Sequence, residues 1–159
     1  MTFNTAWRGA VAHLHMAPRA GAPMSAEAAL TLVVGQGVLG DRYKDGKGYY
    51  SDKPEEGRQI TLFEAEVLEA LKRDHGIDFA PHEHRRNVTT SGVPLNHLVG
   101  RRIRIGPAIL DAMRLSVPCQ YIVELTGKKV FKPLINRSGL NCRIIAGGVI
   151  RVGDPIEPA

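Results

Sequence analysis

The chain has 159 residues, of which 43% are hydrophobic and 23% charged, a composition that excludes wholesale disorder and predicts one domain over residues 1–159. Its 2 cysteines are too few for a disulfide scaffold, and no apolar stretch is long enough for a membrane span or a secretory signal, so we expect a cytoplasmic protein with free thiols. The net charge is +5, but residues 1–84 balance to −3 and residues 85–159 to +8, which predicts either an anion-binding surface or a solvated basic face in the C-terminal half.

The first part of the chain predicts strands and one long loop. Residues 11–16 (V-A-H-L-H-M) alternate between two faces, and residues 30–34 form a second β-rich run, so both are expected to be strands. Residues 45–57 contain three glycines and one proline without periodicity. At about a dozen residues this loop is longer than most connections in compact domains, and long ordered loops are often functional. A mobile surface segment is the alternative.

One helix is expected over residues 61–75. Thr61 and Glu64 form the Thr-x-x-Glu pattern of a capping box, and Gly76 has the conformational freedom to end the helix. The apolar stripe of this helix is expected to pack on the outside of the fold through Phe63, Val67 and Leu71.

The remaining elements are again strands. Residues 101–105 (R-R-I-R-I) alternate, and residues 143–152 are two alternating runs joined by Gly147 and Gly148, the signal of a two-residue hairpin. Strands therefore predominate, and helices are few and short. The expected fold is mainly β, a closed or partly open β-barrel with a few peripheral short helices.

Cys119 is the strongest candidate for chemistry. Ser116 is a suitable cap and Pro118 a suitable first residue for a short helix, which would place Cys119 in the first turn, where the helix dipole favours a thiolate. A thiolate is both a nucleophile and a ligand for soft metals. The alternative is that Cys119 only packs in the interior, as most free cysteines do. Cys142, on an expected strand, is interpreted in that way.

Other motifs give little support to zinc, nucleotide or nucleic-acid binding. His82 and His84 would share a face only on a strand, and no third metal ligand is evident near them. The sequence has no P-loop, no dinucleotide-binding glycine pattern and no hydrolase elbow. Aromatic residues make up only 6% and are not interleaved with the basic ones, so nucleic acid is not an expected partner.

Taken in chain order, six segments of the sequence resemble a MOSC domain, the module found at the C-terminus of molybdenum cofactor sulfurases and as stand-alone proteins. They are G-V-L-G-D-R-Y (37–43), G-R-Q-I-T-L (57–62), R-R-N-V-T-T-S-G-V-P-L-N-H-L-V-G-R-R-I-R-I-G (85–106), P-C (118–119), R-S-G-L (137–140) and G-G-V-I-R-V-G-D (147–154). The likeness spans about residues 35–155. It is closest to the stand-alone branch, because R-R-N stands where other members have Gly-Glu-Asn.

The resemblance implies a β-barrel of the pyruvate-kinase-insert type that works with a molybdopterin-type molybdenum cofactor. Cys119 matches the family cysteine that holds sulfur or ligates molybdenum. A desulfurase domain does not fit in 159 residues, so we expect no pyridoxal phosphate in this chain. The expected cofactor-binding residues, chosen from the basic half and from the resemblance, are Arg86, Asn87, Arg137, Ser138, Arg42 and Arg58.

Two departures from the family pattern affect the expected chemistry. Ser116 and Val117 stand where many stand-alone members have a second cysteine, and Ser138 replaces a frequent glycine. A single thiol argues against dithiol redox chemistry but allows metal ligation. Three functions stay open. The first is a molybdenum-dependent enzyme for sulfur transfer or for reduction of N-hydroxylated compounds. The second is a carrier of cofactor, molybdate or sulfur for a molybdoenzyme or electron-donor protein, and the third is a small anion- or nucleic-acid-binding barrel with a structural Cys119.

Overall fold

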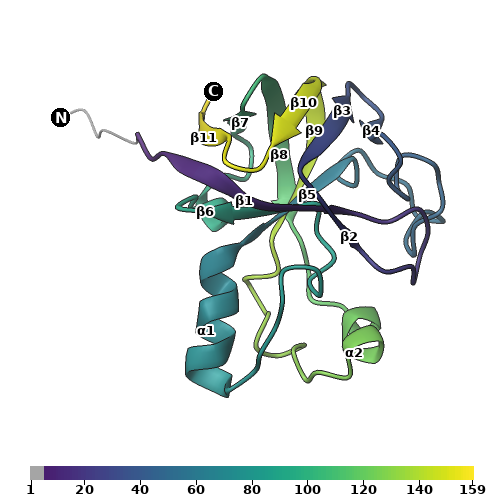
Figure 1. Ribbon diagram of the computed structural model, residues 1–159, viewed down its shortest axis with the longest axis vertical. Helices are drawn as coiled ribbons and strands as arrows, with labels where there is room; N and C mark the ends of the chain where they lie inside the picture. Colours follow the sequence, from purple (N-terminus) through teal and green to yellow (C-terminus); the bar gives the residue numbers. More distant parts are fainter. Residues whose placement is uncertain (1–5) are drawn as a thin grey trace.

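The computed structural model describes residues 6–159, and its main feature is a closed β-barrel (Figure 1). Within these residues the barrel contains seven strands. In hydrogen-bonded order they are β11 (Pro155–Pro158), β7 (Arg102–Ile105), β8 (Ala108–Leu115), β9 (Leu140–Ala146), β5 (Ile60–Glu64), β6 (Val88–Ser91) and β1 (Gly9–Met16). Pairing of β11 with β1 closes the ring, and β2 (Ser25–Glu27) extends one end of β1. The barrel pairs are antiparallel except β5 with β6, which are parallel. The expected mainly β barrel is confirmed.

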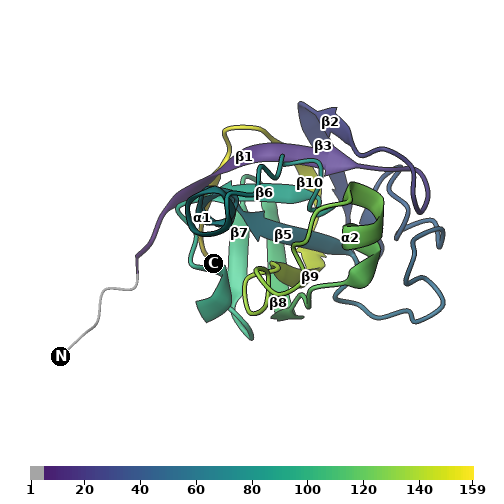
Figure 2. The same cartoon turned by 90° about the horizontal axis from the view of Figure 1, so that it is seen from below.

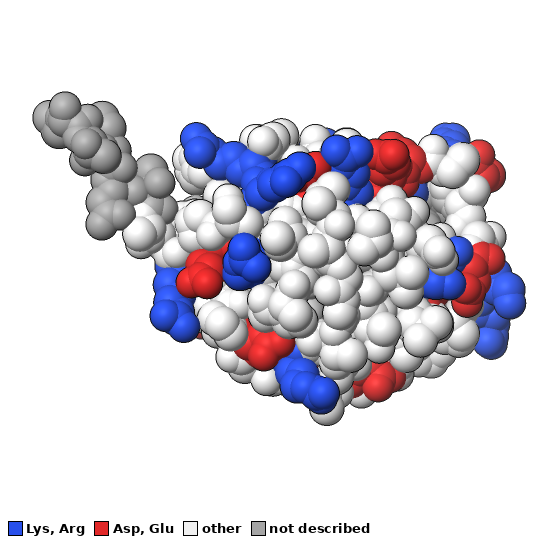
Figure 3. Space-filling view, turned by 90° about the horizontal axis from the view of Figure 1, so that it is seen from above, with Lys and Arg blue, Asp and Glu red and all other residues white. Residues whose placement is uncertain are grey.

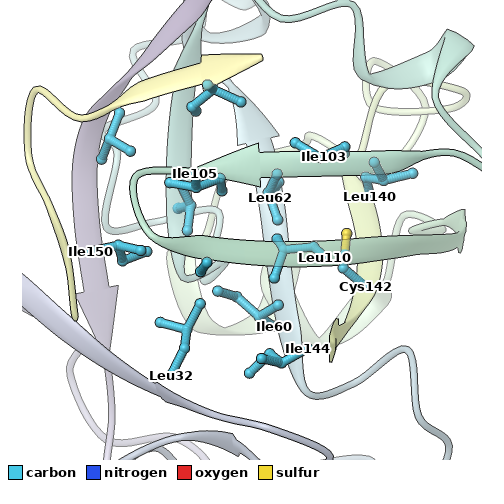
Figure 4. Packing of buried hydrophobic residues seen from close by; sticks show 14 of the residues in the cluster. Leu32, Ile60, Leu62, Ile103, Ile105, Leu110, Leu140, Cys142, Ile144 and Ile150 are labelled. Carbon is cyan, nitrogen blue, oxygen red and sulfur yellow. The ribbon is translucent and has the colours of Figure 1, made fainter. Parts of the chain in front are cut away.

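The barrel interior is filled by alternating apolar side chains (Figure 4). Leu62, Leu110 and Ile144 come from three neighbouring strands and are almost fully buried. A bulge in β1 between Val11 and His13 changes the expected alternation, so that Val11 and Leu14 both reach the core.

A small second sheet lies beside the barrel and corrects the hairpin expected over residues 143–152. It contains β10 (Gly148–Arg151), β3 (Ala29–Val33) and β4 (Gly37–Val38). β9 and β10 follow each other directly, but β9 pairs with β5 and β8 while β10 pairs with β3. The two glycines allow the chain to change sheets: a Cβ at Gly147 would lie 2.4 Å from the Leu32 carbonyl oxygen, and Gly148 has φ +136°. The expected hairpin is therefore wrong.

Two α-helices in the described part of the chain, α1 (Ala65–His75) and α2 (Gln120–Thr126), lie at the same end of the barrel (Figure 1). The expected start of α1 at the capping box is wrong. Thr61 is paired with Asn141 across β5 and β9, and Glu64 is paired with Thr90 across β5 and β6. Both residues of the expected capping box therefore belong to strand β5 of the barrel. The helix begins only after Glu64, which makes no capping hydrogen bond. The expected end is confirmed, because Gly76 has φ 66° and closes the last turn.

Seen from this end, α1 and α2 lie in front of the barrel strands (Figure 2). A second apolar cluster, the lower apolar cluster, packs between these helices and the barrel. Its buried members come from β5, α1, α2 and the loops between them: Phe63, Val67, Leu71, Phe79, Ile122, Val130 and Leu134. The expected packing of the helix outside the barrel is confirmed for Val67 and Leu71, whereas Phe63 belongs to β5 and reaches the same cluster from the strand. The opposite end of the barrel is largely uncharged at its centre and bordered by charged side chains (Figure 3). No helix among residues 6–159 is long and apolar enough to cross a membrane.

Candidate functional site

A polar pocket opens beside α2, where the long connection from β4 to β5 meets the segment before β6 and the end of β8. Its volume is about 120 Å³. Five of the described lining residues are arginines, and none is Asp or Glu. The lining residues are Arg42, Tyr43, Tyr50, Arg58, Thr61, Arg85, Arg86, Arg114, Ser116, Val117, Cys119 and Asn141. The cluster predicts a preference for anions.

Arg85 is the most unusual residue of the pocket. It adopts φ 61°, which is uncommon for a residue other than glycine, and its side chain is buried, with 8% of the residue exposed. Its Nη1 donates to the Ala22 carbonyl at 2.8 Å, but its buried Nη2 has no hydrogen-bond partner. An unpaired buried donor costs about 1–3 kcal/mol, and more when it is charged, so an acceptor on a ligand would stabilise it.

Arg42 and Arg86 complete the inner wall. Arg42 pairs with Asp41 at 3.0 Å and donates from Nη2 to the Arg85 carbonyl at 2.9 Å. Arg86 donates from Nε to the Ser138 carbonyl at 3.2 Å. Neither Arg85 nor Arg86 forms an ion pair with any carboxylate of residues 6–159. Two positive charges therefore face the pocket without a neutralising partner.

The electrostatics of these guanidinium groups also favour an anion. Burial lowers the pKa of Arg85, and the positive charge of Arg42 lowers it further. Burial likewise lowers the pKa of Arg86, while negative charge on Cys119 would raise it. A bound anion offsets these penalties, because it supplies the opposite charge next to groups that have lost their water.

Two further arginines line the pocket and are paired with Glu55, whose carboxylate lies outside the lining. Arg114 contacts this carboxylate at 2.6 Å from Nη2, and Arg58 lies 4.0 Å from it. The Arg58 guanidinium also lies over the Tyr50 ring, 5.0 Å from its centroid. Both arginines are thus held by other groups and are less available to a ligand than Arg85 and Arg86.

Cys119 lies at the pocket wall immediately before α2. It is the N-cap residue with an extended backbone, and its side chain makes no capping hydrogen bond. Contrary to the expectation, Cys119 therefore does not lie in the first turn, because the helix begins at Gln120, two residues after Pro118. Ser116 does not cap the helix and instead binds the Asn141 side chain. Cys119 is half-buried and packs at the edge of the lower apolar cluster, so its thiol reaches the pocket but is shielded on one side.

Tyr50, which belongs to the long loop over residues 45–57, contacts Cys119 and so joins the loop to the pocket wall. Burial raises the pKa of Tyr50, and its hydrogen bond with the Cys119 side chain raises it further. The neighbouring Tyr49 stacks on Tyr121 of α2, with the ring centroids 3.9 Å apart. These aromatic contacts join the loop over residues 45–57 to the helix that follows Cys119. The loop is thus part of the pocket wall, as its length suggested.

The structure brings Cys119, Arg86, Arg42 and Arg58 together at the pocket, but the other expected cofactor-binding residues do not line it. Arg137 donates from Nε to the Pro133 carbonyl at 2.7 Å and turns toward Asp74.

Asn87 is buried and serves the barrel. Its Oδ1 accepts the Thr61 N–H at 3.2 Å, and its Nδ2 donates to the His15 carbonyl at 3.2 Å. Ser138 acts on the pocket only through its backbone carbonyl, which orients Arg86.

Sequence reasoning missed Arg85, Arg114 and the tyrosines of the pocket. The length of the loop that carries Tyr50 was the one available signal for them. Nothing in the sequence distinguishes Arg85 from its neighbour Arg86, because the difference lies in the backbone conformation and in burial.

Cys142 and His84 are packing residues. Cys142 is fully buried inside the barrel (Figure 4), and burial raises the pKa of its thiol. His84 is also buried, with its ring stacked on Phe63 and its Nε2 2.8 Å from the Thr89 hydroxyl. Its Nδ1 accepts the Arg86 N–H at 2.9 Å, so neither ring nitrogen is available for a metal.

Comparison with known protein families decides the relationship, because the model of the MOSC domain matches residues 19–157. The chain belongs to the MOSC domain family. The match includes all of the pocket residues named above, so the pocket lies within the MOSC domain itself. A search of curated proteins gives no significant match.

Solved structures support the same fold. The MOSC chain is similar to the YuaD protein from Bacillus subtilis, with a TM-score of 0.79 and 21% identity over 95% of this chain and 97% of that one. YiiM from Geobacillus stearothermophilus has a TM-score of 0.73 and 14% identity, covering 95% and 75%. YiiM from Escherichia coli has a TM-score of 0.66 and 18% identity, covering 98% and 70%. At these identities the likeness concerns the fold alone.

Proposed function

We propose that this MOSC protein binds a molybdopterin-type molybdenum cofactor, with Arg85 and Arg86 holding an anionic group and Cys119 serving as metal ligand or sulfur carrier. The observation that carries the proposal is the unpartnered Nη2 of Arg85 in a carboxylate-free pocket that also contains an accessible thiol. Family membership adds the association of MOSC domains with this cofactor.

The residues present fit such a group at one end. A pocket of about 120 Å³ is smaller than the roughly 300–1,000 Å³ of sites that enclose a drug-sized ligand. It therefore suits a phosphate or an oxo-metal group, while the larger body of a cofactor would lie in the open mouth. The side chains present suit both the metal and its anionic oxygen atoms. A thiolate is a soft metal ligand, and guanidinium groups bind oxyanions by charge-assisted hydrogen bonds.

Each side chain has a distinct task in this proposal. When bound, the cofactor supplies a two-electron redox centre or a site for terminal sulfur. Arg85 and Arg86 bind and orient its oxygen atoms, and Arg42 fixes Arg85 through the backbone carbonyl. Tyr50 hydrogen-bonds the Cys119 side chain and keeps the proton of its own hydroxyl, because burial raises its pKa. Cys119 holds the metal or the transferred sulfur.

The alternative function is a carrier without turnover that passes cofactor or sulfur to a molybdoenzyme. One observation favours it: among the described residues, Cys119 is the sole thiol in the pocket, and Cys142 is enclosed in the barrel. Dithiol chemistry within the pocket is therefore not available to this chain. The enzymatic alternative needs an external electron donor to complete a reduction.

The test is metal and pterin analysis of protein from a molybdenum-replete host, with variants matched in pairs. We expect molybdenum and oxidised-pterin fluorescence in the wild-type protein. Cys119→Ser should lose the molybdenum, because a hydroxyl is a poor ligand for a soft site. Cys142→Ala should retain it, and circular dichroism should show both variants folded. Arg85→Met with Arg86→Met should lose both molybdenum and pterin. Retention of both by that double variant would overturn the assignment, and cofactor without turnover of N-hydroxylated compounds would favour the carrier.

A further inference from the structure

A second and larger cavity lies outside the proposed cofactor site. Its volume is about 430 Å³, against about 120 Å³ for the arginine pocket, and the two share no lining residue. It forms where Trp7, just before β1, meets the 3-10 helix Leu95–His97 and the ends of β7 and β11. A cavity of this size falls in the range that encloses a small organic ligand.

The floor of this cavity is apolar. Trp7 packs against the barrel core, and Leu98 is buried beside it. Two prolines, Pro94 and Pro158, complete the wall from different segments of the chain. Rigid rings and a buried leucine provide a surface for a flat apolar body at little entropic cost.

The rim of the same cavity is cationic. Exposed side chains of His97, Arg101 and Arg102 lie around it, and none of its described lining residues is Asp or Glu. Arg102 pairs with Asp111 at 3.0 Å, but that carboxylate also pairs with Arg143 at 2.9 Å. Arg101 forms no ion pair with any residue from 6 to 159.

We propose that this cavity is a second ligand site for a small amphipathic anion, a one- or two-ring apolar body that bears a carboxylate. The body would lie on Trp7 and Leu98, and the carboxylate would accept hydrogen bonds from Arg101. The site is independent of the molybdenum proposal, because it uses none of the same residues. An anionic ligand should bind more tightly than a neutral one of the same shape, because only the anion pairs with the positive charge of Arg101 at the rim.

Trp7 provides the assay, because it is the only tryptophan of the chain. We would titrate the full chain with 3-phenylpropionate and follow tryptophan emission excited at a wavelength that the probe does not absorb. A saturable change is expected. The uncharged 3-phenylpropanol should bind at least about tenfold more weakly, because it lacks the charge-assisted hydrogen bonds, and inorganic phosphate should give no saturable change.

Matched variants separate this site from its alternatives. Arg101→Gln should weaken 3-phenylpropionate about tenfold and leave 3-phenylpropanol unchanged, whereas Arg151→Gln, an exposed arginine on β10 outside the cavity, should change neither. Cys119→Ser should bind the probe normally. Equal binding of acid and alcohol, or no effect of Arg101→Gln, would overturn the proposal. So would sedimentation showing a dimer whose Trp7 emission changes on dissociation, because a second copy would then occupy the cavity.

Discussion

Gly139→Ala should be among the most damaging single-methyl additions to this protein. Gly139 lies immediately before β9 with φ +103°, and a Cβ there would be 2.1 Å from the Leu62 carbonyl oxygen on β5. The neighbouring residues pair Leu62 with Leu140, so the methyl group cannot be accommodated without moving one strand from the other. The obstacle is backbone, which cannot rotate away as a side chain can.

The cost has two parts. The positive φ angle costs an alanine about 1–3 kcal/mol, and forcing a methyl group into a packed contact costs about 1–3 kcal/mol more. The sum, about 2–6 kcal/mol, is a large fraction of the roughly 5–15 kcal/mol that stabilises a typical domain. Displacement of β9 would also move the Ser138 carbonyl that orients Arg86, so anion binding should weaken in parallel.

Gly46→Ala is the matched control, because Gly46 has φ +71° and no atom within 4 Å of the added Cβ. Gly46→Ala introduces backbone strain but no steric overlap. Replacing glycine by alanine also lowers the conformational entropy of the unfolded chain, and this effect is the same for both variants and cancels in the comparison. Urea unfolding at one pH should therefore place Gly139→Ala at least about 1 kcal/mol below Gly46→Ala in the free energy of unfolding. Equal losses in the two variants would refute the close approach of β9 to β5.

Three further changes test other features of the fold. Burial raises the pKa of Glu64 to about 7 from an ordinary 4.5, so the stability linked to the neutral carboxyl is fully present below pH 4.5 and is lost as pH rises through 7. Between pH 5 and pH 8 this should lower the free energy of unfolding of the wild-type protein by about 1–3 kcal/mol, after allowance for partial exposure, and Glu64→Gln should abolish the decrease in urea unfolding. The same pH dependence in wild type and variant would contradict it. Cys142→Ala should cost about 1 kcal/mol in urea and leave thiol labelling of Cys119 unchanged. Asn87→Ala should lower the free energy of unfolding by about 2–4 kcal/mol, because it leaves the Thr61 N–H and the His15 carbonyl without their partner. A decrease of less than about 1 kcal/mol would argue against that hydrogen-bond network.

Local patterns predicted element types better than their partners and boundaries. The alternation in residues 101–105 and the helix end at Gly76 follow from side-chain periodicity and backbone freedom, which are local properties. The capping box at Thr61 failed because strand pairing on both sides of β5 outweighs one capping bond. The hairpin at Gly147 failed for a related reason: two glycines permit a turn, but they also permit close approach to another strand.

The candidate site was partly predictable. Cys119 was found from the helix-start pattern around it and Arg86 from the basic half of the chain, and the family resemblance marked both. Arg137 was selected by its charge and by the resemblance of its segment to the family, but its side chain turns away to the Pro133 carbonyl. Arg85 was missed because its distinguishing property is an unpartnered buried nitrogen, which depends on how distant segments pack. Charge patterns identify a region, but the direction in which each guanidinium points is a property of the fold.

Ring closure through β11 has a consequence for how the chain reaches its native state during synthesis. β11 pairs with β1 and with β7, so the edges of both strands remain open until residues 155–158 have left the ribosome. β3 likewise waits for β10, more than a hundred residues later in the sequence. Contacts of such high sequence separation form slowly. The nascent chain therefore exposes unpaired edges of β1 and β3 for most of its translation, and that of β7 for the last third. This is the interval in which a chaperone has the most to protect.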